Sequence, residues 1–447
     1  MFDFILTKNA CSCYNQVDEG GDGLVRTILH CDMNNFFASV ECRKDPRLFD
    51  LPVAVCGSVE ERHGIVLAKN YVAKKYGIVT GEPVFSAKNK CPDLITVEPH
   101  YDDYTYFSGL AKEIYLSYTD LVEPFGADEC WLDVTGSYAL FGDGKTIANE
   151  LRERIKRELG LTISVGVSFN KTFAKLGSDM KKPDAVTVIP KDSFREKIWS
   201  LPANELIGIG PSTTATLARF GIHTIGQLAN AYPPMLKSAL GKNGLKLIEI
   251  ANGRDESPVV SEENAAPIKS ISHGTTTVRD LETHDDIKTV MLALCEELGH
   301  RLLSLKRKAR TVSISLRDNQ LVTRQYQCHL DMPTDSYSVI AKRAFSLMCE
   351  KHVLSAPLRS VTVGVNDLIP SSSPCQVDFF TDTSDTIRRE TLDSVMDMIN
   401  VRFGRDKIRY GLLYSSPLSD VGEGFGFGMV SRKAAEARER PCSSPRC

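Results

Sequence analysis

Two adjacent carboxylates stand inside a strand-like run, and they limit how this part of the chain can fold. The run is FGADECWLDVT, residues 125–135, with Asp128 and Glu129 side by side. Neighbouring residues of a regular strand point to opposite faces, so one charge would enter the core, which is costly unless it is paired or binds a metal. Pro124 and Gly126, just before the pair, indicate a turn. The pair is therefore expected at the start of a strand, with both side chains in one cleft.

A third carboxylate is expected in a comparable place. TILHC, residues 27–31, has the pattern of a strand, and the residues after Asp32 place Phe36, Phe37 and Val40 at helical spacing. Asp32 thus lies at a strand end, before a helix. Three gathered carboxylates would repel each other, whereas a pair of Mg²⁺ ions about 3.5–4 Å apart would neutralise them and suits in-line phosphoryl transfer. The alternative left open by these residues alone is a solvated pair of acids at a strand end.

Length and composition indicate a soluble protein of several domains. The 447 residues correspond to two to four domains at roughly 100–200 residues each. The net charge of −3 gives no overall basic excess, so a nucleic-acid partner would need local patches. No stretch approaches the ~18 apolar residues of a membrane helix, and the N-terminal residues lack the pattern of a secretion signal. The 13 scattered cysteines fit a reducing cytoplasm.

Strand and helix patterns predict an α+β protein of several parts. The expected parts are a flexible extension at 1–26, mixed strands and helices at 27–195, short helices at 196–255, a polar linker at 256–267, an α+β domain at 268–367 and a tail at 368–447. The α+β domain is expected to run strand, helix, strand, strand, helix, strand. Within the tail, residues 385–403 are a possible helix, and the polar end is expected to be disordered.

Four consecutive motifs resemble those of the Y-family DNA polymerases, and the bacterial DNA polymerase IV and UmuC-like branch is the most similar. They are HCDMNNFFASVE, GIVLAKNYVAKKYGI, GADECWLDVT and SVGVSFNKTFAKLGSDMKKPDAVTVI. The resemblance covers about residues 27–380. It implies an α+β right-hand polymerase with palm, fingers (about 42–100), helical thumb and little finger. It also implies template-directed, low-fidelity addition of dNTPs to a primer 3′ end, which is translesion synthesis in DNA repair and damage tolerance.

The resemblance also assigns roles to matching positions. Asp32, Asp128 and Glu129 match the catalytic acids that bind two Mg²⁺ ions, for which Mn²⁺ could substitute, and the main-chain carbonyl of Met33 matches a further metal ligand. The residues that match nucleotide contacts are Phe36, Phe37, Tyr71, Lys74 and Lys182. Phe37 matches the steric gate, whose ring would collide with a ribose 2′-hydroxyl. Cations beside a triphosphate stabilise the charge that spreads over its oxygens in the transition state.

Asn34 and Lys74 are among the positions that depart from the family pattern. Asn34 stands where relatives often carry an acid, although that acid is less essential than the other three. Lys74 stands where many relatives carry arginine. Lysine keeps the charge but lacks the bidentate fork of arginine, which leaves the strength of triphosphate binding in doubt.

DNA contacts are expected in the helical part at 196–255 and in the α+β domain at 268–367. LIGIGPSTTATL, residues 206–217, resembles a helix-hairpin-helix turn, in which Gly208 and Gly210 leave backbone N–H groups for a DNA phosphate. Arg317 and the basic run at 306–310 are expected to contact the DNA backbone from the little finger. The alternatives are an ordinary glycine-rich turn and a solvated basic face.

A short peptide in the tail resembles the bacterial sliding-clamp-binding motif. It is QVDFF, with Gln376, Val377, Phe379 and Phe380 as the expected clamp contacts. Two adjacent aromatic residues in a polar tail would expose apolar surface to water unless a partner covers them, which indicates a binding site.

Three functions can be weighed against each other. The first is an active translesion polymerase, the second a non-catalytic Y-family scaffold that binds DNA and clamp, and the third another palm-fold enzyme such as a nucleotide cyclase. The presence of Asp32, Asp128 and Glu129 favours the polymerase over the scaffold, and the DNA-binding and clamp motifs have no purpose in a cyclase. The expected partners are primed DNA, dNTPs and the sliding clamp, with no membrane, for a monomer in the cytoplasm.

Overall fold

The computed structural model describes residues 25–374 except 61 and 63, and residues 384–404, 407–414 and 416–421. They belong to two compact units, each of which is described by itself. The first joins the residues up to Asn34 with Leu110–Glu263, and the second joins Asn35–Gly109 with the residues from Asn264 on. The predicted extension lies almost wholly outside the described residues, as does the QVDFF peptide.

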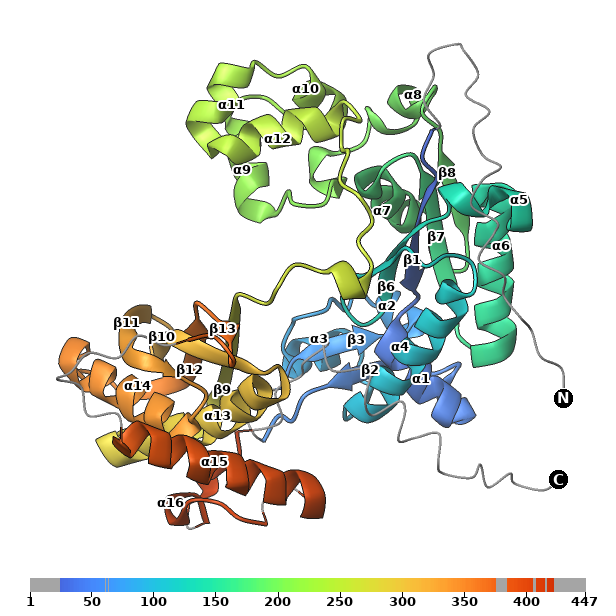
Figure 1. Ribbon diagram of the computed structural model, residues 1–447. Helices are drawn as coiled ribbons and strands as arrows, with labels where there is room; N and C mark the ends of the chain where they lie inside the picture. The colour runs from blue at the N-terminus through green and yellow to red at the C-terminus, as the bar shows by residue number, and fades with distance from the viewer. Residues whose placement is uncertain are drawn as a thin grey trace, which may run out of the picture. The chain divides into compact units, whose positions relative to one another are not determined.

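The first unit is built on a five-stranded sheet with β1 at its centre (Figure 1). In spatial order its strands are β5 (Val122–Pro124), β6 (Glu129–Asp133), β1 (Ile28–Met33), β7 (Ile163–Ser168) and β8 (Val186–Ile189). β1 pairs antiparallel with both β6 and β7, and β7 pairs parallel with β8. The sequence therefore predicted the strand–helix–strand unit around residues 161–190 correctly.

Helix α7 (Lys171–Met180) packs unusually close to this sheet. Its N-cap is Asn170, whose side chain accepts a hydrogen bond from the Phe173 amide. On β7, a Cβ atom added to Gly166 would lie 1.9 Å from the carbonyl oxygen of Ala174 in α7. Only glycine therefore lets the helix backbone approach so closely. Helix α6 (Gly144–Arg154) covers the opposite face, because a Cβ on Gly144 would meet Leu29 and Val167.

The rest of the first unit is helical. Its helices are α5 (Tyr138–Phe141), α8 (Phe194–Ile198), α9 (Pro211–Arg219), α10 (Ile225–Ala229), α11 (Pro233–Leu240) and α12 (Lys242–Ala251). From α8 to α12 they share a hydrophobic core that includes Leu217, Leu228 and Leu236. Thr224 and Gln227 form a reciprocal capping box that starts α10.

The second unit begins with a small three-stranded sheet of order β3-β2-β4. Its elements are α1 (Phe36–Lys44), β2 (Val53–Cys56), β3 (Val66–Lys69), α2 (Tyr71–Lys74), α3 (Val84–Lys90) and β4 (Ile95–Val97), and α4 (Tyr101–Leu116) follows across the boundary between the units. Asn70 joins this sheet to α2, since its side chain accepts hydrogen bonds from the amides of Val53 and Ala73.

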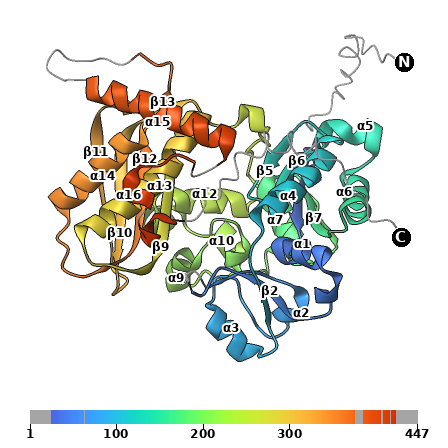
Figure 2. The ribbon, with the colours of Figure 1, turned by 90° about the horizontal axis from the view of Figure 1, so that it is seen from below.

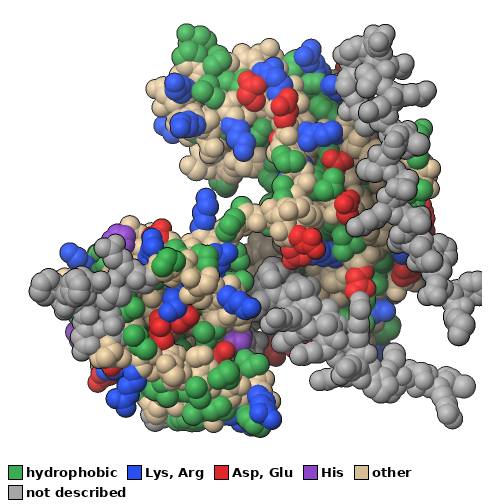
Figure 3. Space-filling view, viewed as in Figure 1, with side chains coloured by type: hydrophobic (Ala, Val, Ile, Leu, Met, Phe, Trp, Pro, Cys, Tyr) green, Lys and Arg blue, Asp and Glu red, His purple; other side chains and the backbone are tan. Residues whose placement is uncertain are grey.

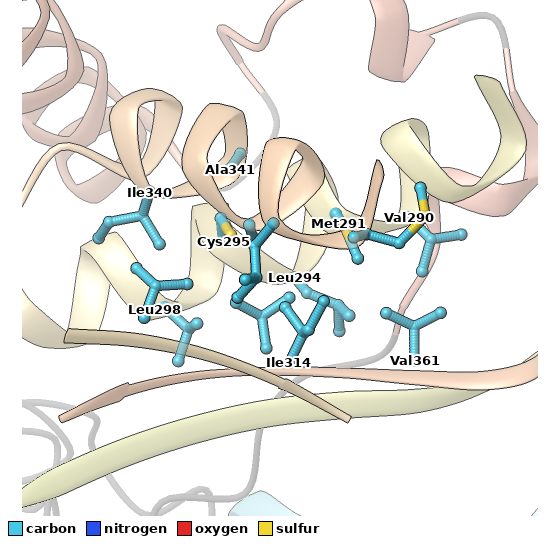
Figure 4. Packing of buried hydrophobic residues seen from close by; sticks show 14 of the residues in the cluster. Val290, Met291, Leu294, Cys295, Leu298, Ile314, Ile340, Ala341 and Val361 are labelled. Carbon is cyan, nitrogen blue, oxygen red and sulfur yellow. The ribbon is translucent and has the colours of Figure 1, made fainter. Parts of the chain in front are cut away.

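The remainder of the second unit is an antiparallel sheet of order β11-β10-β12-β9 covered by two helices. Its elements are β9 (Ser270–Leu281), α13 (His284–Ser304), β10 (Arg307–Asp318), β11 (Thr323–Thr334), α14 (Tyr337–Lys351) and β12 (Leu358–Asn366), with β13 (Ile369–Pro370) beside β10. This order is the one that the sequence predicted. Figure 4 shows the core between helices and sheet, where Leu294 and Leu298 of α13 lie near Ile314 of β10.

A further helix, α15 (Ser384–Phe403), lies beside α13 and α14 (Figure 2) and confirms the possible helix at 385–403. Asp393 anchors it: this carboxylate is 1% exposed and accepts hydrogen bonds from the hydroxyls of Ser336, Ser338 and Tyr410. The prediction of a disordered end is wrong for residues 411–414, which form α16 (Gly411–Tyr414), and for residues 417–419, which form a 3₁₀ turn. The pair of Arg409 with Glu296, 2.7 Å apart, holds this segment on α13.

We expect Gly166→Ala to destabilise the protein by at least about 2 kcal/mol, because its Cβ would force α7 away from the sheet. Gly136→Ala is the control, since nothing lies within 4 Å of a Cβ there, and it should change stability by less than about 0.5 kcal/mol. Urea unfolding monitored by circular dichroism measures both. Equal stabilities would show that α7 does not need the close approach.

Candidate active site

The two adjacent acids are separated by the beginning of a strand. Glu129 is the first residue of β6 and pairs across the sheet with Asp32 of β1. Asp128 lies in the turn just before, where Gly126 has a φ of +84° and the Asp128 carbonyl accepts a hydrogen bond of 3.0 Å from the Met33 amide. The expectation that the pair sits at a strand start, after a turn, is therefore confirmed.

Two lysines neutralise Asp32 and Glu129. The Lys175 Nζ lies 3.2 Å from Oδ2 of Asp32 and 2.9 Å from Oε1 of Glu129. The Lys182 Nζ lies 2.8 Å from the same Asp32 oxygen. Asp179 contacts both ammonium groups, at 3.2 and 2.9 Å. Sequence reasoning identified Lys182 but missed Lys175. The available signal was the helical spacing of Lys171, Lys175 and Ser178, which puts them on one face of α7.

Burial and charge give the three carboxyl groups different pKa values. Burial raises the pKa of Asp32, although Lys182 and Lys175 oppose the shift. Burial, followed by repulsion from Asp32 and Glu129, raises the pKa of Asp128 to about 7. For Glu129, burial acts upward, but hydrogen bonding to His30 and Lys175 outweighs it and lowers the pKa to about 2. Asp128 is thus the acid with the least compensated charge.

The three carboxylates are ligands that suit divalent cations, although Lys175 and Lys182 balance the charge of Asp32 and Glu129 in this structure. Among the described residues, no three His, Cys, Asp or Glu side chains gather closely enough to hold a metal ion. Within the same residues, no lysine or arginine nitrogen lies within 4 Å of the Asp128 carboxylate, and the buried Oε2 of Glu129 faces the His30 Nε2, 3.3 Å away. Carboxylate oxygens in need of positive charge are the ligands that Mg²⁺ prefers.

Asn34 holds the loop that follows α7. Its amide nitrogen donates to the Ser164 hydroxyl, and its amide oxygen accepts from the Asp184 backbone N–H, both at 2.9 Å. Asn34 is 2% exposed. It therefore ties the segment carrying Lys182 to β1 and β7, a structural role for which a neutral amide is suited.

The other nucleotide-contact candidates belong to the second unit. Phe36 is buried, and the Phe37 ring stacks on Tyr104 with centroids 4.1 Å apart and planes 10° apart. The Tyr104 hydroxyl donates to Glu41 at 2.6 Å, which fixes the ring behind Phe37. Tyr71 and Lys74 stand on α2, with the Lys74 ammonium 5.6 Å from the centre of the Tyr71 ring.

The DNA-contact candidates are exposed. Gly208 has a φ of +90°, Gly210 is the N-cap of α9, and a Cβ at either would meet nothing within 4 Å. Figure 3 shows lysine and arginine side chains on the surface of the α9–α12 part. The exposed basic residues there include Arg219, Lys237, Lys242 and Lys246. Arg317 lies exposed on β10, where its Nε donates to the Leu321 carbonyl at 3.3 Å.

Gln376, Val377, Phe379 and Phe380 lie outside the described residues. In the part of the chain that is described, no helix is both long and apolar enough to span a membrane.

Comparison with known proteins identifies the class. Residues 31–179 match the model of the impB/mucB/samB family, and residues 268–379 match that of its C-terminal domain. The DNA polymerase IV of Acetivibrio thermocellus is 51% identical over 388 residues, 87% of this chain and 97% of the relative. DNA polymerase IV 1 of Bacillus subtilis is 36% identical over 392 residues, 87% and 93% of the two chains. The fold is similar to that of a Y-family DNA polymerase chimera, with a TM-score of 0.70 at 23% identity over 77% of this chain and 99% of that one.

The fold is thus that of a multi-domain α+β polymerase, as the sequence predicted. The chain belongs to the impB/mucB/samB family, the Y-family DNA polymerases, and is similar over most of its length to bacterial DNA polymerase IV. It is a DNA-directed DNA polymerase of the translesion type, and these relatives do not favour a non-catalytic scaffold.

The raised pKa of Asp128 predicts a pH effect on the metal-free protein. A carboxyl group whose folded pKa is about 7, against an ordinary 3.8, stabilises the fold fully below pH 3.8, and this contribution is lost as the pH rises through 7. Asp128→Asn removes the titration. In EDTA, the variant should lose roughly 1–3 kcal/mol less stability than wild type between pH 4.5 and pH 8, a range discounted for partial solvent exposure. Parallel stability curves for the two proteins would contradict this account.

Proposed function

We propose that Asp32, Asp128 and Glu129, with the Met33 carbonyl, are the catalytic metal ligands of this polymerase. The observation that carries the proposal is the pairing of Asp32 with Glu129 across β1 and β6, with Asp128 in the adjoining turn. Two Mg²⁺ ions bound there would activate the primer 3′-hydroxyl and neutralise the leaving pyrophosphate. Mn²⁺ should be able to replace them, because it accepts the same oxygen ligands.

Lys182 is proposed to bind the incoming triphosphate. Its ammonium group is held by Asp179 at 2.9 Å as well as by Asp32 at 2.8 Å. When divalent cations neutralise Asp32, Lys182 keeps Asp179 as a partner and can turn toward phosphate oxygens. Tyr71 and Lys74 are proposed as further triphosphate contacts, because a hydroxyl and a cation stabilise the charge that develops on those oxygens.

Phe37 is proposed as the steric gate, with Phe36 packed beneath the sugar site. A gate works only if its ring cannot move aside, and the stacked Tyr104 ring limits that movement. The Tyr104 hydroxyl is in turn fixed by the buried Glu41 carboxylate.

The domain boundaries are proposed as palm and fingers at 27–195, thumb at 196–255, linker at 256–267 and little finger at 268–367. The open backbone at Gly208 and Gly210, and the exposed Arg317, support DNA-backbone contacts from the thumb and little finger. The QVDFF peptide supports binding to a bacterial sliding clamp. A monomer acting in the cytoplasm is the simplest form of such an enzyme.

Primer extension tests the metal ligands. With Mg²⁺, dNTPs and a primed template, Asp128→Ala/Glu129→Ala should extend the primer about 1,000-fold more slowly than wild type, because transition-state charge stabilisation worth several kcal/mol is lost. Asp120→Ala, which removes an exposed acid of the same unit, should retain wild-type extension. Undiminished extension by the double variant would refute the assignment. Wild type that binds primed DNA without extending it would favour the scaffold.

Sugar selection tests Phe37. Phe37→Val should lower the preference for dCTP over CTP, measured as the ratio of kcat/KM values, on the order of 100-fold, since a steric clash is removed. Phe37→Tyr keeps the ring and should keep most of the preference. If Phe37→Val discriminates as wild type does, the gate is elsewhere.

Surface plasmon resonance with a bacterial sliding clamp tests the peptide. Phe379→Ala/Phe380→Ala should weaken binding at least about 10-fold, because aromatic anchors dominate such contacts. Phe403→Ala removes another exposed phenylalanine and should leave binding unchanged. If Phe379→Ala/Phe380→Ala binds the clamp with wild-type affinity, the clamp contact lies outside QVDFF.

A further inference from the structure

A buried histidine lies directly beneath the acidic site. His30 is on β1 two residues before Asp32, so both side chains point to the sheet face that α7 covers. The His30 side chain is 0% exposed. A polar ring buried this completely needs partners for both ring nitrogens.

Ser178 of α7 holds one edge of the ring. The His30 Nδ1 lies 2.8 Å from the Ser178 Oγ, and Ser178 is itself fully buried. The same hydroxyl lies 2.8 Å from the Lys175 carbonyl oxygen. With Nδ1 facing the Ser178 hydroxyl as an acceptor, a neutral His30 carries its hydrogen on Nε2, the nitrogen that can donate to Glu129. Trp131, the cross-strand neighbour on β6, packs its ring against His30 edge to face, with centroids 5.2 Å apart. The orientation of the imidazole is thus fixed from two sides.

The other edge of the ring faces Glu129. The His30 Nε2 lies 3.3 Å from Oε2 of Glu129. Both atoms are buried, and neither has a hydrogen bond to any other described residue. The second oxygen of Glu129, Oε1, faces Lys175 at 2.9 Å, and Lys175 also contacts Asp32. The two oxygens therefore have different surroundings: Oε2 faces inward, and Oε1 faces the side that Glu129 shares with Asp32.

We propose that His30, held by Ser178, is a positioning residue that fixes the Glu129 carboxylate with Oε1 toward the cation-binding side of the site. The proposal rests on the proposed function, since it gives His30 a part in metal binding by Glu129. Without the ring, Oε2 would stay buried without a partner and the carboxylate would be free to rotate. Removing a group that orients a metal ligand typically lowers metal affinity about 10–100-fold.

Two amide substitutions at His30 distinguish the role of its Nε2 atom from that of its Nδ1 atom. In His30→Gln the amide nitrogen can take the position of Nε2, and in His30→Asn it can take the position of Nδ1. Mn²⁺ binding is measured by electron paramagnetic resonance in a complex with a dideoxy-terminated primer, template and dNTP, in which no bond can form. The Gln variant should bind Mn²⁺ within about 3-fold of wild type, and the Asn variant about 10-fold more weakly.

Ser178→Ala is the second variant, because it leaves His30 in place and removes its support. It should weaken Mn²⁺ binding and raise the Mg²⁺ concentration for half-maximal extension several-fold, with KM for primed DNA unchanged. A purely structural role would instead lower the melting temperature without moving the metal affinity. Thermal unfolding shows whether His30→Asn and Ser178→Ala are folded. If both are folded and bind Mn²⁺ as tightly as wild type does, the proposal is overturned. If the Asn variant does not fold, the Ala variant alone decides.

Failure of the proposed function gives a different pattern. If Asp128→Ala/Glu129→Ala binds Mn²⁺ as tightly as wild type in the same complex, the acids are not the metal ligands. If that double variant loses binding while both His30→Asn and Ser178→Ala keep it, only the role of His30 fails.

Discussion

The close approach of α7 to the central sheet is the constraint on which the acidic site depends. Gly166 on β7 faces Gly177 on α7, and a Cβ on Gly177 would lie 3.1 Å from the Gly166 Cα. With no side chains in between, the helix lies low enough for Ser178 to reach His30 and for Lys175 to reach both Asp32 and Glu129. A helix held farther from the sheet by intervening side chains would leave these groups apart.

The charges of the site are arranged in layers. His30 and Ser178 lie beneath Glu129, the carboxylates lie above them, and the ammonium groups of Lys175 and Lys182 balance Asp32 and Glu129. Asp128 has no ammonium group within 4 Å among the described residues, and burial together with repulsion from Asp32 and Glu129 raises its pKa to about 7. A buried carboxylate without a nearby ammonium group favours the binding of a divalent cation, because the cation offsets the unfavourable free energy of the buried charge.

Much of this arrangement could be predicted from the sequence. The period-two pattern of residues 161–169 predicted strand β7, and Pro124 and Gly126 predicted the turn before Asp128. The four spaced motifs predicted the family. His30 and Lys175 could not be found in this way, because their roles depend on strand register and on the rotation of α7. Nothing in the local sequence says that His30 pairs with Gly166 and Trp131 across the sheet. The short helix α16 was missed because the residues just before it, Arg409 and Tyr410, are held by Glu296 and Asp393 from distant positions in the sequence.

The most direct test of the metal-ligand assignment is a crystal structure of the protein with primed DNA, an incoming dNTP and Mn²⁺, with diffraction data that locate manganese by anomalous scattering. Two manganese peaks are expected, with carboxylate oxygens of Asp32, Asp128 and Glu129 within about 2.0–2.4 Å, as for a hard divalent cation. The Lys175 ammonium should have moved off the Asp32 and Glu129 oxygens. Manganese bound elsewhere, with Lys175 still bridging the two acids beside a bound dNTP, would contradict the assignment.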